Sequence, residues 1–193
     1  MSAELTPPPP AALPPIEVLD SISAGIFAAS LAPLFEGAPR FLGRLANARP
    51  FGSIGRLFER AGEIAHAMPA AEQVELIDAH PRLGAPPESM SASSFSEQGY
   101  DSKGAERAAH DAEVERAHVA ADLDRLNAAY EDRFGFRYCV FVAGRPRAAL
   151  LPAMAAALDA DRDTEIARAL DAIVDIAMDR HARSVHRPTE GST

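Results

Sequence analysis

Apolar residues recur at steps of four, three and four in two long stretches of the chain, and this spacing is typical of amphipathic α-helices. They are Val119, Leu123, Leu126 and Tyr130 in residues 105–133, and Ile166, Leu170, Ile173 and Ala177 in residues 163–184. The composition agrees, because Ala and Leu supply most of the 47% hydrophobic content, whereas aromatic residues make up 6% and Trp is absent. The sequence therefore predicts an all-α fold.

The length of 193 residues suits a single domain with one well-filled core. Four consecutive prolines, Pro7–Pro10, prevent helix formation near the N-terminus, so residues 1–15 are predicted to form a flexible extension. We expect a multi-helix bundle over residues 16–185 and a short tail over residues 186–193.

Prolines and glycines divide the predicted domain into helices and loops. Four helices are expected between Ile16 and His80. Residues 82–104 are rich in Gly, Pro and Ser, and predict a long ordered loop with one helical turn that starts at Ser94. Loops of this length in a compact domain are often functional. Further helices are expected over residues 105–133, 146–160 and 163–184, with a buried, partly extended segment after the first.

The formal net charge of −9 argues against a nucleic-acid partner, because binding to phosphates requires a basic face and no cluster of Lys or Arg is visible. No apolar run approaches the roughly 20 residues of a membrane span, and no signal peptide is recognisable, so a cytoplasmic protein without a membrane partner is expected. The single cysteine, Cys139, excludes an intramolecular disulfide. It lies in an apolar run, where a buried, unreactive thiol is expected.

Several common catalytic motifs are absent from the sequence. It contains no glycine-rich nucleotide loop, no nucleophile elbow and no zinc-protease helix. Lys103 is the only lysine and lies in a polar loop, which argues against a Schiff base or a pyridoxal phosphate anchor. We therefore set both of these mechanisms aside.

Two Glu-x-x-His pairs, Glu63/His66 and Glu115/His118, have the ligand spacing of a di-iron carboxylate bundle. Such a site also requires a Glu from each of two further helices. The two-residue pattern is weak in a chain with 28 acidic residues, so we expect surface positions for these side chains and predict no metal site.

Three polar residues stand out from otherwise structural patterns. Arg180 continues the apolar stripe of the last helix, so its guanidinium must either reach water or meet an anion. His80 lies where Pro81 stops a helix, and a favourable contact with the helix dipole would also explain a histidine there. Glu97 completes the pattern Ser94-x-x-Glu97 of an N-terminal capping box. The pattern alone leaves open whether Glu97 is a cap or a catalytic group.

Three blocks of the sequence resemble the signature blocks of a known family. "LIDAHPRLG", "SSFSEQ" and "LNAAYEDRFGFRYCVFVAGR" follow the order found in the OHCU decarboxylases, the 2-oxo-4-hydroxy-4-carboxy-5-ureidoimidazoline decarboxylases of urate breakdown. The weaker pieces "LFEGAPR" and "RPF" and the last helix keep the same order, so the resemblance spans residues 16–185. The chain departs from the common pattern at Arg82, at Arg137, where Pro is frequent, and in its Pro-rich N-terminus.

The resemblance implies an all-helical fold and cofactor-free loss of CO2 from OHCU to give (S)-allantoin. It implies catalytic roles for His80, Glu97 and Arg180. The implied substrate-lining positions are Pro81, Ser94, Phe95, Ser96, Gln98, Tyr138, Cys139, Val140, Phe141 and Val142. A small-molecule substrate and a homodimer are the partners that it implies.

The chemistry of this reaction suits a chain without a cofactor. Decarboxylation leaves an electron pair on carbon, and a hydroxyimidazoline with conjugated C=N and C=O groups delocalises that pair itself. The protein must orient the substrate, stabilise the developing charge and deliver a proton to one face. His80, with an ordinary pKa of about 6.5, is expected to handle the proton, and Arg180 to bind carboxylate or oxo groups. Glu97 is expected either to orient His80 or to hold the ureido N–H groups.

Two other functions remain compatible with the sequence. One is the di-iron bundle, which stoichiometric iron or manganese in the purified protein would favour. The other is a non-catalytic helical module that binds protein partners through the Pro-rich extension or a helix groove. Formation of optically active allantoin would favour the decarboxylase over that module.

Overall fold

A computed structural model of the chain describes residues 12–85, 90–98 and 109–185. These residues form helices and no β-strand, which confirms the predicted all-α fold. In chain order the elements are α1 (Ile16–Ser21), α2 (Ala24–Leu31), α3 (Pro39–Asn47), α4 (Ile54–Ala67), α5 (Ala70–Asp78), α6 (Ala92–Glu97), α7 (Ala109–Phe134), the 3-10 turn η2 (Arg147–Leu150), α8 (Leu151–Ala157) and α9 (Arg162–Val185). None of the described helices is long and apolar enough to cross a membrane.

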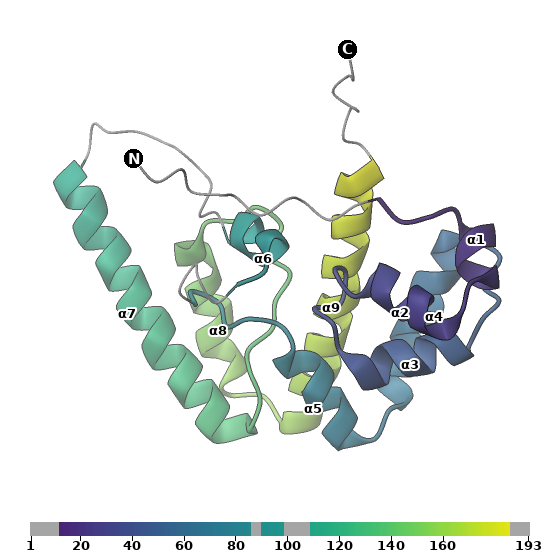
Figure 1. Ribbon diagram of the computed structural model, residues 1–193. Coiled ribbons are helices and arrows are strands. Elements are labelled where there is room, and N and C mark those ends of the chain that lie inside the picture. The colour runs from purple at the N-terminus through teal and green to yellow at the C-terminus, as the bar shows by residue number, and fades with distance from the viewer. Residues whose placement is uncertain (1–11, 86–89, 99–108, 186–193) are drawn as a thin grey trace, which may run out of the picture.

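Helix α9 organises the fold. It packs against α4 and α5, while α3 contacts α2, α4 and α5, and α7 packs against α8. Figure 1 shows α9, in yellow, between the group α1–α4 and the pair α7 and α8. Segments far apart in the sequence therefore meet beside α9.

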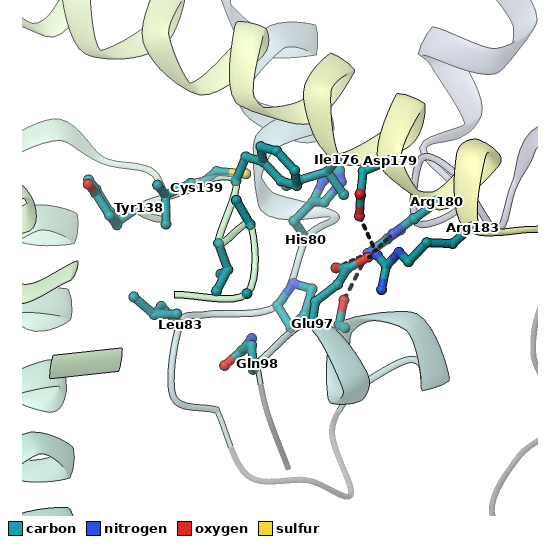
Figure 2. Close-up of a pocket in the computed structure, with 17 residues that line it drawn as sticks. His80, Leu83, Glu97, Gln98, Tyr138, Cys139, Ile176, Asp179, Arg180 and Arg183 are labelled. Atoms are coloured by element: carbon teal, nitrogen blue, oxygen red, sulfur yellow. Dashed lines mark hydrogen bonds and ion pairs between the residues drawn. The ribbon is translucent and has the colours of Figure 1, made fainter. Parts of the chain in front are cut away.

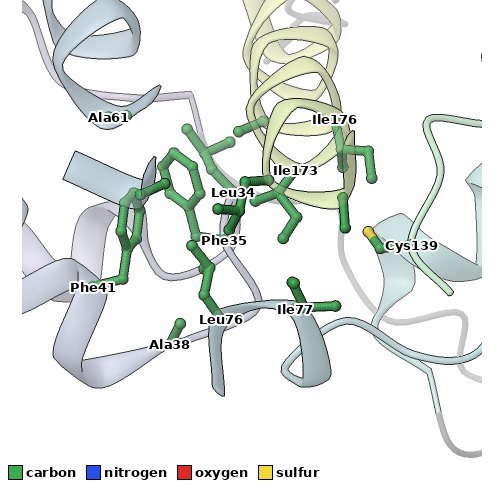
Figure 3. Packing of buried hydrophobic residues seen from close by; sticks show 14 of the residues in the cluster. Leu34, Phe35, Ala38, Phe41, Ala61, Leu76, Ile77, Cys139, Ile173 and Ile176 are labelled. Carbon is green, nitrogen blue, oxygen red and sulfur yellow. The ribbon is translucent and has the colours of Figure 1, made fainter. Parts of the chain in front are cut away.

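The predicted apolar stripe of α9 is buried, which confirms its helical periodicity. In Figure 3, Ile173 and Ile176 of α9 face Leu76 and Ile77 of α5. Burying one such side chain stabilises a fold by about 1.5–3 kcal/mol. This packing fixes the rotation of α9 about its axis, and the next position on the stripe, Arg180, is buried as well.

The N-terminal part of the chain contains one more helix than the sequence predicts, because five helices rather than four lie between Ile16 and His80. The backbone is extended at Ile22, with ψ at 164°. Ser23 then caps a new helix, since its hydroxyl oxygen accepts a hydrogen bond from the N–H of Ile26 at 3.4 Å.

The predicted turn within residues 82–104 is helix α6, but Ser94 does not cap it. The N–H of Ser94 donates to the hydroxyl of Ser91 at 3.2 Å, so Ser91 is the cap and Ser94 lies inside the helix. The capping-box interpretation of Ser94 and Glu97 is therefore wrong. A serine also stands three residues before Ser94, and serine is a favoured N-cap residue at either position, although only Ser94 is followed by a Glu three residues later.

Other predictions concern parts of the chain outside the described residues. They are residues 1–11 of the Pro-rich extension, residues 86–89 and 99–104 of the long loop, residues 105–108 of the predicted long helix, and the tail over 186–193. For these parts the sequence-based expectations stay predictions.

Candidate active site

A cavity of about 270 Å³ lies between the end of α5, helix α6, the stretch after α7 and the last turns of α9. Most of the residues predicted from the sequence line it, namely His80, Pro81, Ser94, Glu97, Gln98, Tyr138, Cys139, Val140, Phe141, Val142 and Arg180. Figure 2 shows how His80, Glu97 and Arg180 lie around this space. Phe95 and Ser96 belong to α6, and their side chains lie outside the described part of the chain.

The imidazole of His80 is buried at the end of α5. Its Nδ1 atom lies 3.2 Å from the carbonyl oxygen of Leu76, which can only accept a hydrogen bond. Nδ1 therefore carries the proton, and Nε2 is the ring nitrogen with a free lone pair. Within the described residues, Nε2 is buried and has no partner.

Burial is the main reason that the pKa of His80 falls from 6.5 to about 4. The positive charge of Arg180 lowers this pKa further, while the negative charge of Glu36 opposes the shift. His80 is therefore neutral near pH 7 and can act as a base there. The structure thus corrects the expectation of an ordinary pKa for this histidine.

Arg137, one of the departures from the family pattern, holds the main chain around His80. Its Nη1 donates to the carbonyl oxygens of Asp78 at 2.8 Å and of His80 at 3.1 Å. The main-chain N–H of Arg137 donates to the Asp78 carboxylate at 2.8 Å. Arg137 therefore satisfies carbonyls that the end of α5 leaves without helical partners.

The guanidinium of Arg180 meets anions inside the protein. Its Nε donates to Oε1 of Glu97 at 2.7 Å, and its Nη2 lies 3.0 Å from Oε2 of Glu97 and 2.7 Å from Oε1 of Glu36. Its Nη1 donates to the carbonyl oxygens of Pro33 and Leu34 at 3.0 and 3.2 Å. Each nitrogen of the guanidinium thus already serves a protein acceptor.

This network decides between the two alternatives for Arg180, a guanidinium that reaches water and one that pairs with an anion. Only 1% of the Arg180 side chain is exposed, so it does not reach water. Burial alone would lower the pKa of Arg180, but Glu97 and Glu36 hold that pKa above its ordinary value. The guanidinium is therefore charged and paired.

Glu97 is bound by two arginines. Besides Arg180, Nη2 of Arg183 donates to its Oε1 at 2.9 Å, and no hydrogen bond joins Glu97 to His80 within the described residues. Of the two roles left open by the sequence, orientation of the imidazole therefore has no support in this geometry.

Glu36 was not among the residues predicted from the sequence. Its Oε1 accepts hydrogen bonds from Ser94 at 2.6 Å, from Ser91 at 2.9 Å and from Arg180 at 2.7 Å. Burial alone would raise the pKa of Glu36, but the charge of Arg180 and the bond from Ser94 hold it below its usual range. Its backbone has a φ of 50°, and the next residue, Gly37, has a φ of 77°.

A non-glycine residue in this left-handed region costs roughly 1–2 kcal/mol, and such residues cluster at functional sites. A signal for Glu36 was present in the sequence, because it stands in the block "LFEGAPR" directly before a glycine. That block gave no reason to choose Glu36 over its neighbours.

Ser94 and Gln98 line the cavity, but their polar groups are engaged. The Ser94 hydroxyl donates to Glu36 and accepts from Arg180 at 3.1 Å. The Gln98 amide accepts from the N–H of Gly84 at 2.7 Å and donates to the carbonyl of Arg82 at 3.2 Å. Gln98 thereby fastens the turn that follows His80.

Residues 138–142 form the opposite wall. Arg168 holds this wall against α9, since its Nη1 donates to the carbonyl of Cys139 at 2.8 Å and its guanidinium stacks 4.5 Å from the Tyr138 ring centre. Burial raises the pKa of the Cys139 thiol to about 12, which agrees with the expected unreactive cysteine. The main-chain N–H groups of residues 139–142 have no hydrogen-bond partner among the described residues.

The two Glu-x-x-His pairs do not face a shared interior. Glu63, His66, Glu115 and His118 are all exposed. The Nε2 atom of His66 lies within hydrogen-bonding distance, 2.7 Å, of the Asp171 carboxylate. Among the residues that the structure describes, no group of three or more His, Cys, Asp or Glu side chains could hold a metal ion. The geometry that a di-iron bundle requires is therefore not formed by these pairs.

Comparison with known proteins assigns the chain to a family. The family model for OHCU decarboxylase matches residues 20–182, which include the residues that line the cavity except Arg183. The chain belongs to the OHCU decarboxylase family. The resemblance of its signature blocks to this family is thereby confirmed.

Curated relatives of this OHCU decarboxylase family member include bifunctional proteins. The chain is 33% identical over 153 residues to the uric acid degradation bifunctional protein PucL of Bacillus subtilis, an alignment that covers 79% of this chain and 29% of PucL. It spans a similarly small share, 31%, of the uric acid degradation bifunctional protein of Bacillus sp. strain TB-90. It is 28% identical over 151 residues to the 2-oxo-4-hydroxy-4-carboxy-5-ureidoimidazoline decarboxylase of Haloferax volcanii, covering 78% of this chain and 84% of that protein.

Solved structures share the fold. An OHCU decarboxylase crystallised in the presence of (S)-allantoin matches with a TM-score of 0.58 at 21% identity, over 76% of this chain and 91% of the other. An (S)-allantoin synthase matches with a TM-score of 0.60 at 21% identity, over 88% of this chain and 53% of the other. These likenesses establish the helical architecture that brings the cavity walls together.

Proposed function

We propose that this chain decarboxylates OHCU to (S)-allantoin without a cofactor. The observation that carries this proposal is the buried, neutral imidazole of His80, whose Nε2 has no hydrogen-bond partner among the residues that the structure describes. His80 lines a cavity that is also lined by an ion-paired carboxylate, Glu97. Membership of the OHCU decarboxylase family and the names of the relatives support the choice of substrate.

The reaction sets specific demands on the cavity. When CO2 leaves the ring carbon, the bonding electron pair passes into the adjacent C=N group, and that nitrogen takes up a proton. The product of this step is an enol, which must lose the proton of its hydroxyl group and gain a proton on the carbon that bears the ureido group. The face on which that last proton arrives decides which enantiomer of allantoin forms.

His80 suits the proton transfer. A neutral imidazole with a free Nε2 can accept the enol proton and return it to the neighbouring carbon from the same side. Its lowered pKa makes the protonated imidazole a stronger acid, which favours return of the proton to carbon. The main-chain contacts of Arg137 fix the position from which His80 acts.

Glu97 and the wall formed by residues 138–142 suit substrate binding. The carboxylate of Glu97 is a strong acceptor for the ureido N–H groups, and its contacts with Arg180 keep it charged and immobile. The main-chain N–H groups of residues 139–142, which have no partner in the described part of the chain, can donate to ring oxygens as negative charge develops. In this proposal Arg180 acts on the substrate through Glu97.

The test is turnover of freshly generated OHCU. The purified protein is added to urate with urate oxidase and hydroxyisourate hydrolase, and the optical activity of allantoin is followed. Production of (S)-allantoin faster than in the spontaneous reaction supports the proposal. A racemic product at the spontaneous rate would refute it and favour a non-catalytic helical module.

Glu97→Gln is the matched variant, because it keeps the size and hydrogen-bonding oxygen of the side chain and removes its charge. We expect turnover to collapse while the fold is retained. Glu63→Gln, an exposed change on α4 with the same loss of charge, serves as the control and should keep full activity.

We also propose, from the sequence and the family resemblance, that the protein acts as a homodimer in the cytoplasm. Analytical ultracentrifugation at micromolar concentration tests the first statement, and fractionation of the producing cell tests the second. A monomer, or a protein found outside the cytoplasmic fraction, would contradict them.

A further inference from the structure

Arg183 lies one turn beyond Arg180 on α9 and also lines the cavity (Figure 2). The two arginines differ in their exposure and in the hydrogen-bond donors that remain for a ligand. The Arg180 side chain is 1% exposed and all three of its nitrogens serve protein acceptors, whereas the Arg183 side chain is 47% exposed. Within the described residues, Nε and Nη1 of Arg183 have no hydrogen-bond partner.

The remaining nitrogen of Arg183 is shared between two carboxylates. Nη2 lies 2.9 Å from Oε1 of Glu97 and 2.7 Å from Oδ2 of Asp179. Both carboxylates line the cavity, and with Arg180 already saturated by Glu97 and Glu36, the cavity has no surplus of positive charge. An anionic substrate therefore needs a cation that can change partners.

We propose that Arg183 binds the carboxylate of the substrate, and that Asp179 competes with the substrate for the same guanidinium. A two-point contact with a carboxylate uses donors on two neighbouring nitrogens. Nη1 is available, and Nη2 becomes available when the substrate carboxylate replaces Asp179. This inference rests on the proposed decarboxylation of OHCU, because it assumes that the ligand carries a carboxylate.

The positions of the residues support this exchange. Asp179 and Arg183 are four residues apart on one helix, where such pairs contribute little to stability when exposed. Separating them is therefore easy. Glu97 stays in place when Arg183 moves, because Arg180 holds both of its oxygens.

The kinetic experiment compares Arg183→Gln, Arg183→Lys and Asp179→Asn with the unchanged protein, using freshly generated OHCU. Loss of a charged hydrogen-bonded contact predicts that Arg183→Gln raises KM about tenfold, with kcat changed by less than about threefold. Arg183→Lys keeps the charge but not the planar fork, so we expect a smaller rise. Asp179→Asn removes the competitor and should lower KM.

Arg56→Gln is the control, since it makes the same change in net charge at an exposed position on α4 that does not line the cavity. A KM for Arg183→Gln equal to that of Arg56→Gln would overturn the role of Arg183. A higher KM for Asp179→Asn would overturn the competition.

A binding experiment separates this inference from the proposed function. Hydantoin-5-acetate and hydantoin share a ring and differ in a carboxylate, and calorimetry measures the affinity of each. We expect the unchanged protein to bind the acid more tightly, and Arg183→Gln to lose that preference. If the protein fails to turn over OHCU but shows this preference and its loss in Arg183→Gln, the proposed function is refuted and the carboxylate site is supported. If Arg183→Gln keeps the preference for the acid, the carboxylate-binding role of Arg183 is refuted.

Discussion

Nη2 of Arg180 and Oε1 of Glu36 lie 2.7 Å apart, although 144 residues separate them in the sequence. This contact ties the last helix to the loop between α2 and α3. The same guanidinium binds Glu97. One buried side chain therefore fixes two carboxylates, of which one faces the cavity and the other lies behind it.

Replacing Arg180 by Met should lower the free energy of unfolding by about 3–5 kcal/mol, because two buried carboxylates would lose their charged partner. Urea denaturation measures this loss. Arg183→Met is the matched control on the same helix, and we expect it to cost about 1 kcal/mol or less since that side chain is half exposed. Equal losses for the two variants would contradict the assignment of Arg180 as the buried anchor.

Glu36→Gln should shift the pH dependence of catalysis. Gln keeps an oxygen for Ser94, Ser91 and Arg180 but removes the negative charge that raises the pKa of His80. The acid limb of kcat/KM should therefore move to lower pH, and kcat should fall because Arg180 loses an anionic partner. A pH profile between 3.5 and 8 checks this, with Glu59→Gln on the surface of α4 as the control. An unshifted acid limb would show that Glu36 has only a structural role.

His80 predicts a particular pH dependence of activity. Because its pKa is about 4, the catalytic base stays neutral down to that pH, and kcat/KM should hold well below pH 6.5 before it falls. Steady-state rates in overlapping buffers measure this profile. An acid limb centred near pH 6.5 would mean that the histidine is not buried as described.

The same group links stability to pH. The pKa of His80 is lower in the folded chain than in the unfolded chain, so protonation favours unfolding. Its contribution is fully present above pH 6.5 and declines as pH falls toward 4, by up to about 3 kcal/mol. Urea midpoints at pH 7 and pH 4.5 test this. The decline should be smaller in His80→Gln, and an identical decline would disprove the link.

Arg137→Met removes the donors to the carbonyls of Asp78 and His80. We expect kcat to fall about tenfold with little change in KM, because the base is displaced while the binding groups stay in place. The cost in stability should be about 1–2 kcal/mol, as for the loss of one or two hydrogen bonds. Arg147→Met, at an arginine of η2 that donates to the carbonyl of Gln98, provides a comparison that should leave His80 in position.

The sequence predicted the parts of the site that depend on local rules. The catalytic roles of His80 and Arg180 were implied by the family resemblance. Local rules singled out the two positions, because a proline ends the helix behind His80 and Arg180 continues a periodic apolar stripe. Both inferences use residues within a few positions of each other. The fold class followed from the same periodicity and from composition.

The parts that failed depend on contacts between distant segments. Glu36 is defined by partners that lie 55 to 144 residues away, and no local pattern specifies such a pairing. The cap of α6 was misplaced because the local pattern Ser94-x-x-Glu97 favours Ser94, whereas in the fold the Ser94 hydroxyl is engaged by the distant Glu36 and Ser91 caps the helix. The low pKa of His80 likewise arises from burial that the assembled fold creates.

Helix α9 carries both core residues and a site residue, and this limits insertions and deletions within it. Core residues such as Ile173 and the site residue Arg180 occupy one face of α9. Deleting a single residue between them would turn the guanidinium by about 100° around the helix axis while leaving the composition almost unchanged. Surface loops tolerate insertions and deletions. In α9, by contrast, the number of residues between Ile173 and Arg180 must stay constant for the guanidinium to remain at the cavity.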